Sequence, residues 1–254
     1  MNNLRGSFVL SLFLFSLIAA GQDAQKYLSA RINQGFVIVH SQDVRSVENS
    51  YPRGLEFDIG WHKRSERVWA DCQCYPKTGL SITFWDFDNP NVLGYGLTGM
   101  FYLQPVFRAD RKLSFSVRGG IGLSYKTKPH DVELNPDNQS YSTAVAFPLQ
   151  LGLTVNYQLN EHWQLDLHTV YNHISNGGLK QPNKGINWPT AGIGLTRYFR
   201  PVKFPEREKI DWRLENAPRN RTDFNAFFTY HEPDDGYVLI SGGLEVKRAR
   251  RIGR

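Results

Sequence analysis

The chain has 254 residues, a formal net charge of +6, 41% hydrophobic and 13% aromatic residues, and two cysteines. This length is enough for one substantial domain. Much of the positive charge is concentrated in the last residues, Lys247, Arg248, Arg250, Arg251 and Arg254. Since the remainder is close to neutral, the composition excludes an extended nucleic-acid-binding face, and we expect no nucleic-acid partner.

The N-terminus has the features of a secretory signal peptide. A basic Arg5 precedes an apolar stretch, Phe8–Ala20, and the small residues Ala19 and Gly21 stand where cleavage is favourable. The stretch is too short to cross a bilayer as a helix, and no later run reaches the roughly 18 apolar residues that such a helix needs. We therefore expect residues 1–21 to direct export and then to be removed, and we expect no transmembrane helix.

The mature sequence alternates between apolar and polar residues with a period of two. In Val145–Tyr157 every odd position is apolar or aromatic, whereas the even positions are mostly small or polar. A strand in a membrane barrel has this pattern, because one face meets lipid and the other faces the lumen. The sequence predicts an all-β protein, an antiparallel up-and-down outer-membrane β-barrel at residues 22–199, in the envelope of a Gram-negative cell.

Alternating runs give about eight strands, the smallest usual number for a closed barrel. The expected strands are Phe36–His40, Gly54–His62, Leu80–Phe87, Tyr95–Phe107, Lys112–Tyr125, Ser142–Tyr157, Trp163–Ser175 and Thr190–Phe199. Two of these strands contain a proline, Pro105 or Pro148, which has no N–H for the ladder. We expect a bulge or a gap in strand pairing near each.

The connections between these strands fall into two groups. Arg108–Arg111 and Gln158–His162 are short, whereas Ser41–Arg53, Lys126–Tyr141 and Asn176–Pro189 are long. If the mature N-terminus lies in the periplasm, the long connections lie outside the cell, as is usual for this class. The strand Trp163–Ser175 then ends near the outer leaflet. Aromatic residues at strand ends predict two interfacial girdles: Tyr95, Tyr125 and Tyr171 on the outer side, and Phe107, Tyr157, Trp163 and Phe199 on the inner side.

The remaining link, Lys63–Thr78, contains both cysteines. Cys72 and Cys74 are too close in sequence for an easy unstrained disulfide, and they have no partners for a metal site. We interpret them as incidental, with a strained local disulfide as the alternative, and we expect no metal and no cofactor. Asp166 is at an even-numbered position of the strand Trp163–Ser175, and these positions are expected to face the lumen. Its expected partner there is Arg118 or His168.

Residues 200–254 begin with a proline-punctuated linker. A hairpin-like pair follows, Asp223–Tyr230 and Gly236–Val246. Two interpretations remain open. Either the barrel closes at Phe199 and this region is an appendage, or the hairpin belongs to a larger or truncated barrel.

The last residues of Trp163–Ser175 combine two groups that are used in catalysis. Residues two apart in a strand share a face, so His173 and Ser175 continue the lipid-facing row of Leu165 and Leu167. A serine hydroxyl becomes a nucleophile when a neutral imidazole accepts its proton. The alternative is an ordinary interfacial histidine beside a serine that ends a strand.

The segment HISNGGLKQPNKGIN resembles the signature of the lipid A 3-O-deacylase family, also called acyloxyacyl hydrolases. These are eight-stranded outer-membrane barrels with a Ser-His-acid site on the exterior. The resemblance implies a carboxylic ester hydrolase that removes an acyl chain from lipid A or lipopolysaccharide. It assigns Ser175 as the nucleophile and His173 as the general base. It also assigns Asn176 and the backbone at Gly177 and Gly178 to the oxyanion site, where simple turn chemistry is the alternative.

The sequence departs from the family at the third catalytic position, where Asn187 replaces a glutamate. An asparagine carbonyl accepts the imidazole N–H, but it does not offset the imidazolium charge. Lys180 and Lys184 are candidates for contacts with lipid phosphates, or else they belong to a solvated loop. Trp188, together with Leu179, is a candidate for the path of the acyl chain.

A second hypothesis is a non-catalytic outer-membrane barrel that binds lipid or acts in surface interactions. The Asn187 departure and the unexplained C-terminal region favour it. A soluble periplasmic β-sandwich is a third, weaker possibility, because it would leave long apolar rows exposed to water. The cleaved acyl position and the oligomeric state stay open.

Overall fold

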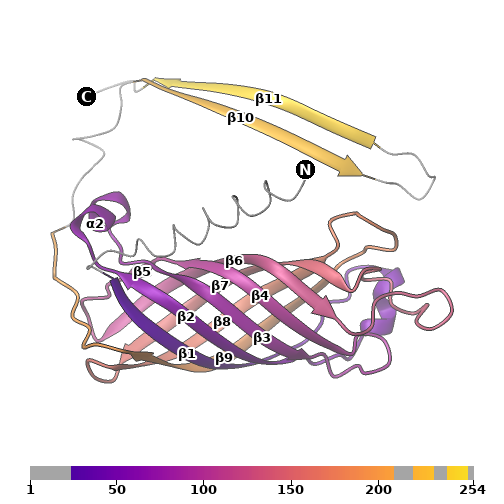
Figure 1. Cartoon of the computed structure of the whole chain (residues 1–254), viewed down its shortest axis with the longest axis horizontal. Coiled ribbons are helices and arrows are strands. Elements are labelled where there is room, and N and C mark those ends of the chain that lie inside the picture. Colours follow the sequence, from indigo (N-terminus) through magenta and orange to yellow (C-terminus); the bar gives the residue numbers. More distant parts are fainter. Residues whose placement is uncertain (1–23, 209–219, 232–238, 251–254) are drawn as a thin grey trace, which may run out of the picture.

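The computed structural model describes residues 24–208, 220–231 and 239–250. The expected signal peptide lies outside these ranges. The chain forms a closed, antiparallel barrel of eight strands, which confirms the predicted fold class and strand number. The strands lie side by side along the barrel in chain order, and the longer loops gather at one end (Figure 1). We call this the long-loop end and the opposite one the short-loop end.

The barrel strands have the following bounds: β1 Ala24–Gly35, β2 Arg53–Lys63, β3 Lys77–Asp86, β4 Tyr95–Gln104, β5 Val106–Phe107, β6 Leu113–Lys126, β7 Val145–Gln158, β8 Trp163–Ser175 and β9 Ile186–Tyr198. Consecutive strands pair around the wall, except that β4 pairs with β6 and not with β5, and β1 pairs with β9 to close the wall. The short β5 continues the line of β4 and also pairs with β6. The barrel therefore closes at β9, which ends at Tyr198.

The prediction for the first strand was wrong. Strand β1 occupies Ala24–Gly35 rather than Phe36–His40. The segment 36–40 instead continues β1 along the end of β9, where the N–H of Ile38 donates to the carbonyl of Asn187 at 2.8 Å. Val37 is buried at the barrel end, whereas Phe36 and Val39 are exposed.

Both prolines interrupt strand pairing, as predicted. Pro105 separates β4 from β5, and no ladder pair is formed between Leu103 and Val106 along β6. Pro148 pairs normally with β8, but the β6–β7 ladder is broken between Leu149 and Ala146. The missing N–H of proline explains both gaps.

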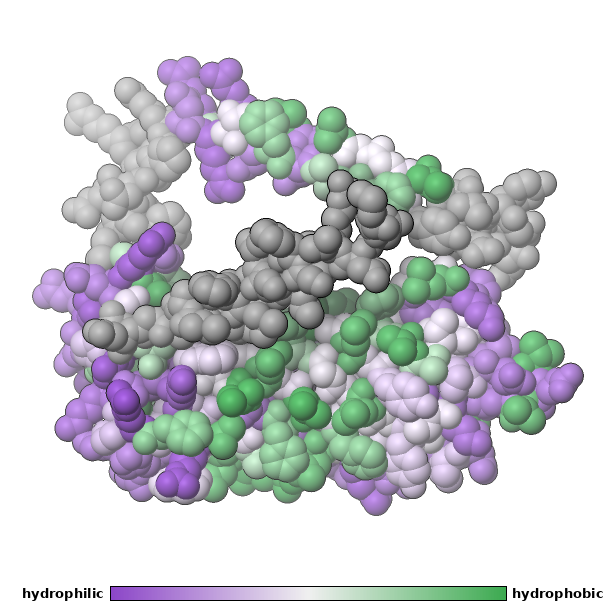
Figure 2. Space-filling view, viewed as in Figure 1, coloured by the Kyte–Doolittle hydropathy of each residue, from purple (hydrophilic) through white to green (hydrophobic). Residues whose placement is uncertain are grey.

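The outer wall is apolar around the middle of the barrel. In strands β2, β4, β6 and β7, residues that point outward are mostly exposed and residues that point inward are mostly buried. Figure 2 shows hydrophobic side chains over the middle of the wall and hydrophilic ones at both ends. The predicted girdle residues Tyr95, Tyr125 and Tyr171 are exposed near the long-loop end, and Phe107, Tyr157 and Phe199 are exposed near the short-loop end. Trp163 is half-exposed.

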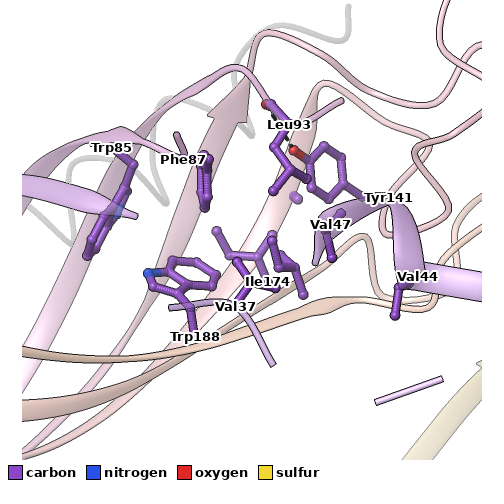
Figure 3. Packing of buried hydrophobic residues seen from close by; sticks show 11 residues of the cluster. Val37, Val44, Val47, Trp85, Phe87, Leu93, Tyr141, Ile174 and Trp188 are labelled. Carbon is purple, nitrogen blue, oxygen red and sulfur yellow. Dashed lines mark hydrogen bonds between the residues drawn. The ribbon is translucent and has the colours of Figure 1, made fainter. Parts of the chain in front are cut away.

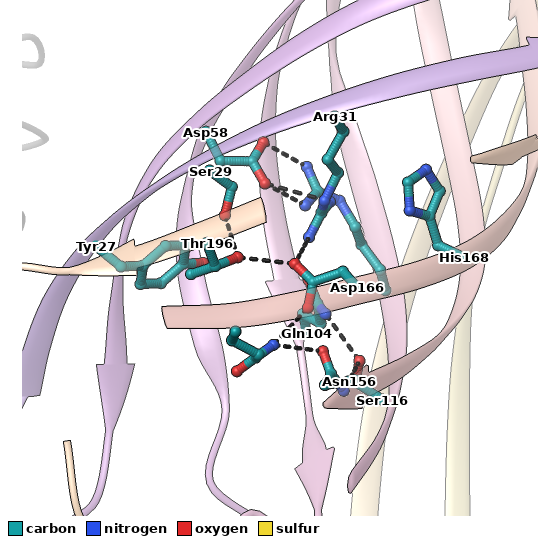
Figure 4. A network of polar contacts seen from close by, with 12 residues as sticks. Tyr27, Ser29, Arg31, Asp58, Gln104, Ser116, Asn156, Asp166, His168 and Thr196 are labelled. Atoms are coloured by element: carbon teal, nitrogen blue, oxygen red, sulfur yellow. Dashed lines mark hydrogen bonds and ion pairs between the residues drawn. The ribbon is translucent and has the colours of Figure 1, made fainter. Parts of the chain in front are cut away.

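The lumen is filled with paired charges rather than open. Arg118 donates to both carboxylate oxygens of Asp58 at 2.7 and 3.0 Å and contacts Glu56 at 3.1 Å. Arg31 contacts Glu56 and Asp58, each at 3.2 Å. All four side chains are buried, and opposite charges offset one another across strands (Figure 4).

Asp166 faces the lumen as predicted, but its partners differ from the expected ones. It accepts a hydrogen bond from Thr196 at 2.7 Å and lies 3.9 Å from the guanidinium of Arg31. His168 contacts Asn33 instead, at 2.8 Å. Strand β1, which was misplaced in the prediction, supplies the missing partners Arg31 and Asn33.

An apolar cluster closes the long-loop end from within. Val37, Val44 and Val47 from the first loop pack with side chains of the strand ends (Figure 3). The other members are Trp85, Phe87, Leu93, Tyr141, Ala146, Ile174, Ile186 and Trp188. The short 3-10 helix η1, Gln42–Val47, carries Val44 and Val47 into this cluster. Ile174 and Trp188 connect it directly to the ends of β8 and β9.

The link between β2 and β3 folds into helix α2, Glu66–Cys72, with Ser65 as its N-cap. Cys72 and Cys74 form a disulfide directly after the helix. The interpretation of these cysteines as incidental was therefore wrong. The left-handed backbone at Gln73 brings the two neighbouring positions together.

The C-terminal region forms the expected hairpin, with β10 at Asn220–His231 and β11 at Leu239–Arg250. The two strands make a sheet of their own. Within the described ranges, no helix is long and apolar enough to cross a membrane.

Candidate active site

Strand β8 delivers two functional side chains to the outer wall at the long-loop end. His173 and Ser175 point outward and are half-exposed, whereas Ile174 between them is buried in the apolar cluster. The alternation of the strand fixes this arrangement, because residues two apart share a face and lie about 6.8 Å apart along the strand. Among the described residues no hydrogen bond joins Ser175 to His173. The two side chains nevertheless share the outer face.

Asn187 lies beside His173 on the neighbouring strand. The two residues are register partners in the β8–β9 ladder. His173 Nδ1 lies 2.7 Å from Asn187 Oδ1. Because a carboxamide oxygen only accepts, this contact assigns the proton to Nδ1 and leaves Nε2 as the acceptor nitrogen. The sequence prediction placed these two residues together, and the structure confirms the contact.

Gly185 holds the other side of the His173 ring. Its φ angle is +72°, and a Cβ added there would lie 2.9 Å from Cε1 of His173. A side chain at this position would therefore need both a strained backbone and a displaced imidazole. The absence of a side chain lets the backbone pass close to the ring.

The turn after Ser175 is organised by the side chain of Asn176. This residue is buried, and its Nδ2 donates to the carbonyl of Lys180 at 2.6 Å and to Ser142 Oγ at 3.0 Å. Its Oδ1 accepts from the N–H of Gly178 at 3.0 Å. The carboxamide of Asn176 is thus used within the turn.

The backbone donors of the same turn are mostly engaged as well. The N–H of Asn176 donates to Asn183 Oδ1 at 2.8 Å, and that of Gly178 is bound as described. Gly177, with a φ angle of +69°, carries an N–H without a partner in the described part of the chain. Of the three predicted oxyanion residues, Asn176 and Gly178 therefore have their donors occupied, and Gly177 keeps an N–H without a partner among the described residues.

The loop 176–185 is attached to the loop 127–144. Gly185 donates to the carbonyl of Ser140 at 2.8 Å, next to Tyr141, which is buried in the apolar cluster. Burial raises the pKa of Tyr141, so its phenol stays neutral and donates to the carbonyl of Leu93 at 3.3 Å. The loop 176–185 is thus held in place by its contact with the loop 127–144, which is anchored in the apolar cluster.

The two predicted substrate-binding lysines lie in different surroundings. Lys184 is ion-paired with Asp43 at 3.2 Å, so part of its charge is already offset. Lys180 is exposed, and its carbonyl serves the turn through Asn176 and Ser142. The ammonium of Lys180 is therefore more available to an anion than that of Lys184.

Trp188 does not line a path on the outer wall, contrary to the prediction. Its side chain is 1% exposed and packs edge-on against Trp85 and Phe87 inside the barrel. Its even number already places it on the inner face of β9. The apolar neighbours of the site on the outside are Phe147 and Leu149, which are register partners of Ser175 and His173. They are 44% and 54% exposed.

His40 also reaches the site, which the sequence analysis did not foresee. Its Nδ1 lies 3.4 Å from Nδ2 of Asn187, and its Nε2 lies 3.0 Å from the carbonyl of Lys184. His40 and Asn187 lie far apart in the sequence, and the pairing of segment 36–40 with the end of β9 brings them together. The alternation of apolar and polar residues does not indicate which strand this segment pairs with.

The arrangement provides a hydroxyl, an imidazole with a free acceptor nitrogen, and an oriented carboxamide on one outer face. These are the parts of a serine hydrolase site in which the third group is neutral. Among the described residues, no group of histidine, cysteine, aspartate or glutamate side chains is arranged to hold a metal ion.

Comparisons with known proteins identify related sequences and folds. The sequence model of the family described as lipid A 3-O-deacylase (PagL) matches residues 53–196, more than half of the chain. The matched range includes His173, Ser175 and Asn187. No curated protein matches the chain.

Three solved structures are among those similar to the chain. The outer membrane enzyme PagL is 14% identical with a TM-score of 0.48, covering 65% of this chain and 97% of that one. Neisserial surface protein A is 11% identical with a TM-score of 0.48, covering 69% and 99%. The N-terminal barrel domain of Pseudomonas aeruginosa OprF is 14% identical with a TM-score of 0.42, covering 70% and 99%.

Proposed function

Since the chain belongs to the lipid A 3-O-deacylase family, we propose that it hydrolyses the 3-O-linked acyl ester of lipid A in the outer membrane, with Ser175 as nucleophile and His173 as general base. The supporting observation is the contact between His173 Nδ1 and Asn187 Oδ1 at 2.7 Å. It leaves Nε2 as the acceptor, on the same outer face as Ser175.

The reaction proceeds in two steps. Ser175 Oγ attacks the ester carbonyl carbon while His173 Nε2 takes the hydroxyl proton. The tetrahedral intermediate collapses when His173 returns that proton to the sugar oxygen, which leaves as an alcohol. Water then attacks the acyl-enzyme, gives a proton to His173, and releases the fatty acid as Ser175 regains its proton.

The negative oxygen of the intermediate needs a hydrogen-bond donor. We assign the N–H of Gly177 to this role, because Asn176 and Gly178 use their donors to hold the turn. Loss of one oxyanion donor typically costs about 10² to 10³ in rate. Asn176 and Gly178 thus act on the oxyanion by fixing the conformation of the turn.

The proposed location of the site fits a lipid substrate. The apolar belt places the barrel wall in hydrocarbon, and the site lies at its long-loop edge, which we assign to the outer leaflet. An acyl chain reaches Ser175 beside Phe147 and Leu149, and Lys180 is placed for contact with a phosphate. Lateral diffusion in the membrane brings the substrate to this outer face.

The test uses purified protein in detergent micelles with lipopolysaccharide. The wild type should release one fatty acid per lipid A, and the mass of the product should identify the cleaved position. Ser175→Ala should abolish release of the fatty acid while keeping the fold. The fold is checked by circular dichroism and by the difference in gel mobility between unheated and heated protein. Retained release in this folded variant would refute the assignment.

One observation favours a second candidate, a non-catalytic barrel that binds lipid. Asn187 does not offset the charge that His173 acquires during catalysis, which lowers turnover. A wild-type protein that binds lipopolysaccharide, releases no fatty acid, and leaves a serine-directed acylating probe unreacted would support this candidate.

A further inference from the structure

His40 contacts the site from outside the barrel wall. Its segment is fixed to β9 by the bond from the N–H of Ile38 to the carbonyl of Asn187 at 2.8 Å. The imidazole then lies between two groups, the carbonyl of Lys184 and the carboxamide nitrogen of Asn187. The ring thus touches the residue that touches His173.

The contacts of His40 determine which of its nitrogens carries the proton. The carbonyl of Lys184 only accepts, so at 3.0 Å it assigns the proton of the neutral ring to Nε2. Nδ1 is then an acceptor, and it faces Asn187 Nδ2, a donor, at 3.4 Å. The carbonyl of Ile38, also 3.4 Å from Nδ1, accepts only from a ring that carries a proton on Nδ1, and the neutral ring with that proton gives up the shorter bond to Lys184.

The acceptor nitrogen Nδ1 of His40 determines the orientation of the Asn187 carboxamide. With its NH2 directed at His40, its oxygen faces Nδ1 of His173. The reversed carboxamide would present NH2 to His173 and favour the tautomer that has its proton on Nε2. That tautomer does not accept the proton of Ser175, and an error of this kind costs about 10⁴ in a serine triad.

A carboxylate at position 187 would not need this control, because both of its oxygens accept. An asparagine has one acceptor and one donor, so its orientation has to be fixed by a neighbour. We propose that His40 is a positioning residue that orients Asn187, keeps His173 in the productive tautomer, and so compensates for the missing carboxylate. The catalytic consequence rests on the proposed function, whereas the tautomer itself does not.

The kinetic test compares His40 variants in two backgrounds. Loss of the outer-shell partner of a metal-bound histidine typically costs about 10- to 100-fold, and we expect a loss of the same order for this metal-free histidine: His40→Phe should lower kcat by about that factor with KM little changed. His40→Gln, which retains an acceptor and a donor, should keep most of the rate. Val39→Ala, a control in the same segment, should leave the rate unchanged.

In the Asn187→Glu background, His40→Phe should change kcat by less than about threefold, because the carboxylate needs no orientation. Equal losses in both backgrounds would show that His40 only supports the local structure, and no loss in either would remove its role. Both results would overturn the proposal.

A spectroscopic measurement separates this proposal from the proposed function. Protein labelled with ¹⁵N-histidine should show His173 with its proton on Nδ1, and His40→Phe should shift the ring toward the other tautomer or a mixture. If the wild type is inactive, the proposed function fails while this measurement still decides the role of His40. An unchanged His173 tautomer in His40→Phe would refute that role.

Discussion

Replacing Asn187 with glutamate should accelerate the reaction, because it adds a negative charge beside the imidazolium that forms in the transition state. In the wild type, Asn187 Oδ1 lies 2.7 Å from His173 Nδ1. Two unit charges about 4 Å apart attract by roughly 1 kcal/mol in water and roughly 4 kcal/mol at an effective dielectric constant near 20. Both side chains are half-exposed, so the gain lies between these values.

Each ~1.36 kcal/mol corresponds to a factor of ten in rate. The expected increase in kcat for Asn187→Glu is therefore roughly 5- to 1000-fold. The assay is fatty-acid release from lipopolysaccharide in micelles, measured across pH. The acidic limb of the profile should move to higher pH, because the carboxylate stabilises the protonated form of the general base.

The matched control is Asn187→Gln, which has the length of glutamate without its charge. A charge effect predicts that glutamate exceeds both asparagine and glutamine. If glutamate and glutamine give the same rate, the position does not act through charge on His173. The account of Asn187 as the third member of the site would then be refuted.

Three further changes test the packing around the site. Gly185→Ala should lower kcat by roughly 100-fold, because a displacement of the catalytic imidazole by about 1 Å has an effect of this size. Steady-state rates of the folded variant measure the change, and a normal rate would contradict the close approach of Gly185 to His173. Arg118→Ala should destabilise the barrel by about 3–5 kcal/mol, because the buried carboxylates of Asp58 and Glu56 then share the single guanidinium of Arg31. Urea unfolding in lipid vesicles measures this loss, and a value below about 1 kcal/mol would argue against the pairing. Trp188→Ala should cost about 3–5 kcal/mol in the same assay, and a change in acyl-chain preference without a loss of stability would contradict its buried position.

The sequence predicted the wall of the barrel well where alternation is strong. Strand β7 has apolar residues at every outward position, and its bounds were found closely. Strand β1 was missed because its outward face includes Lys26 and Gln34 beside Leu28 and Ile32. The following segment, with Val37, is more apolar, but it serves the internal cluster.

The site was predicted in the parts that a single strand pair determines. Parity placed His173 and Ser175 outward, and the next strand brought Asn187 beside them. The same alternation directs Trp188, an even-numbered residue, toward the inside of the barrel. The prediction that Trp188 lines the path of the acyl chain failed because it did not apply this alternation. The contact of His40 with Asn187 depends on the segment just past β1 lying along the end of β9, and contacts between residues so far apart in the sequence leave no periodic signal.

Identification of the acylated residue tests the central claim most directly. The protein is incubated with lipopolysaccharide or a serine-directed acylating probe, quenched in acid, digested, and mapped by mass spectrometry. The account predicts one adduct, on the peptide that contains Ser175, and its loss in Ser175→Ala. An adduct on another residue, or fatty-acid release that persists without Ser175, would contradict it.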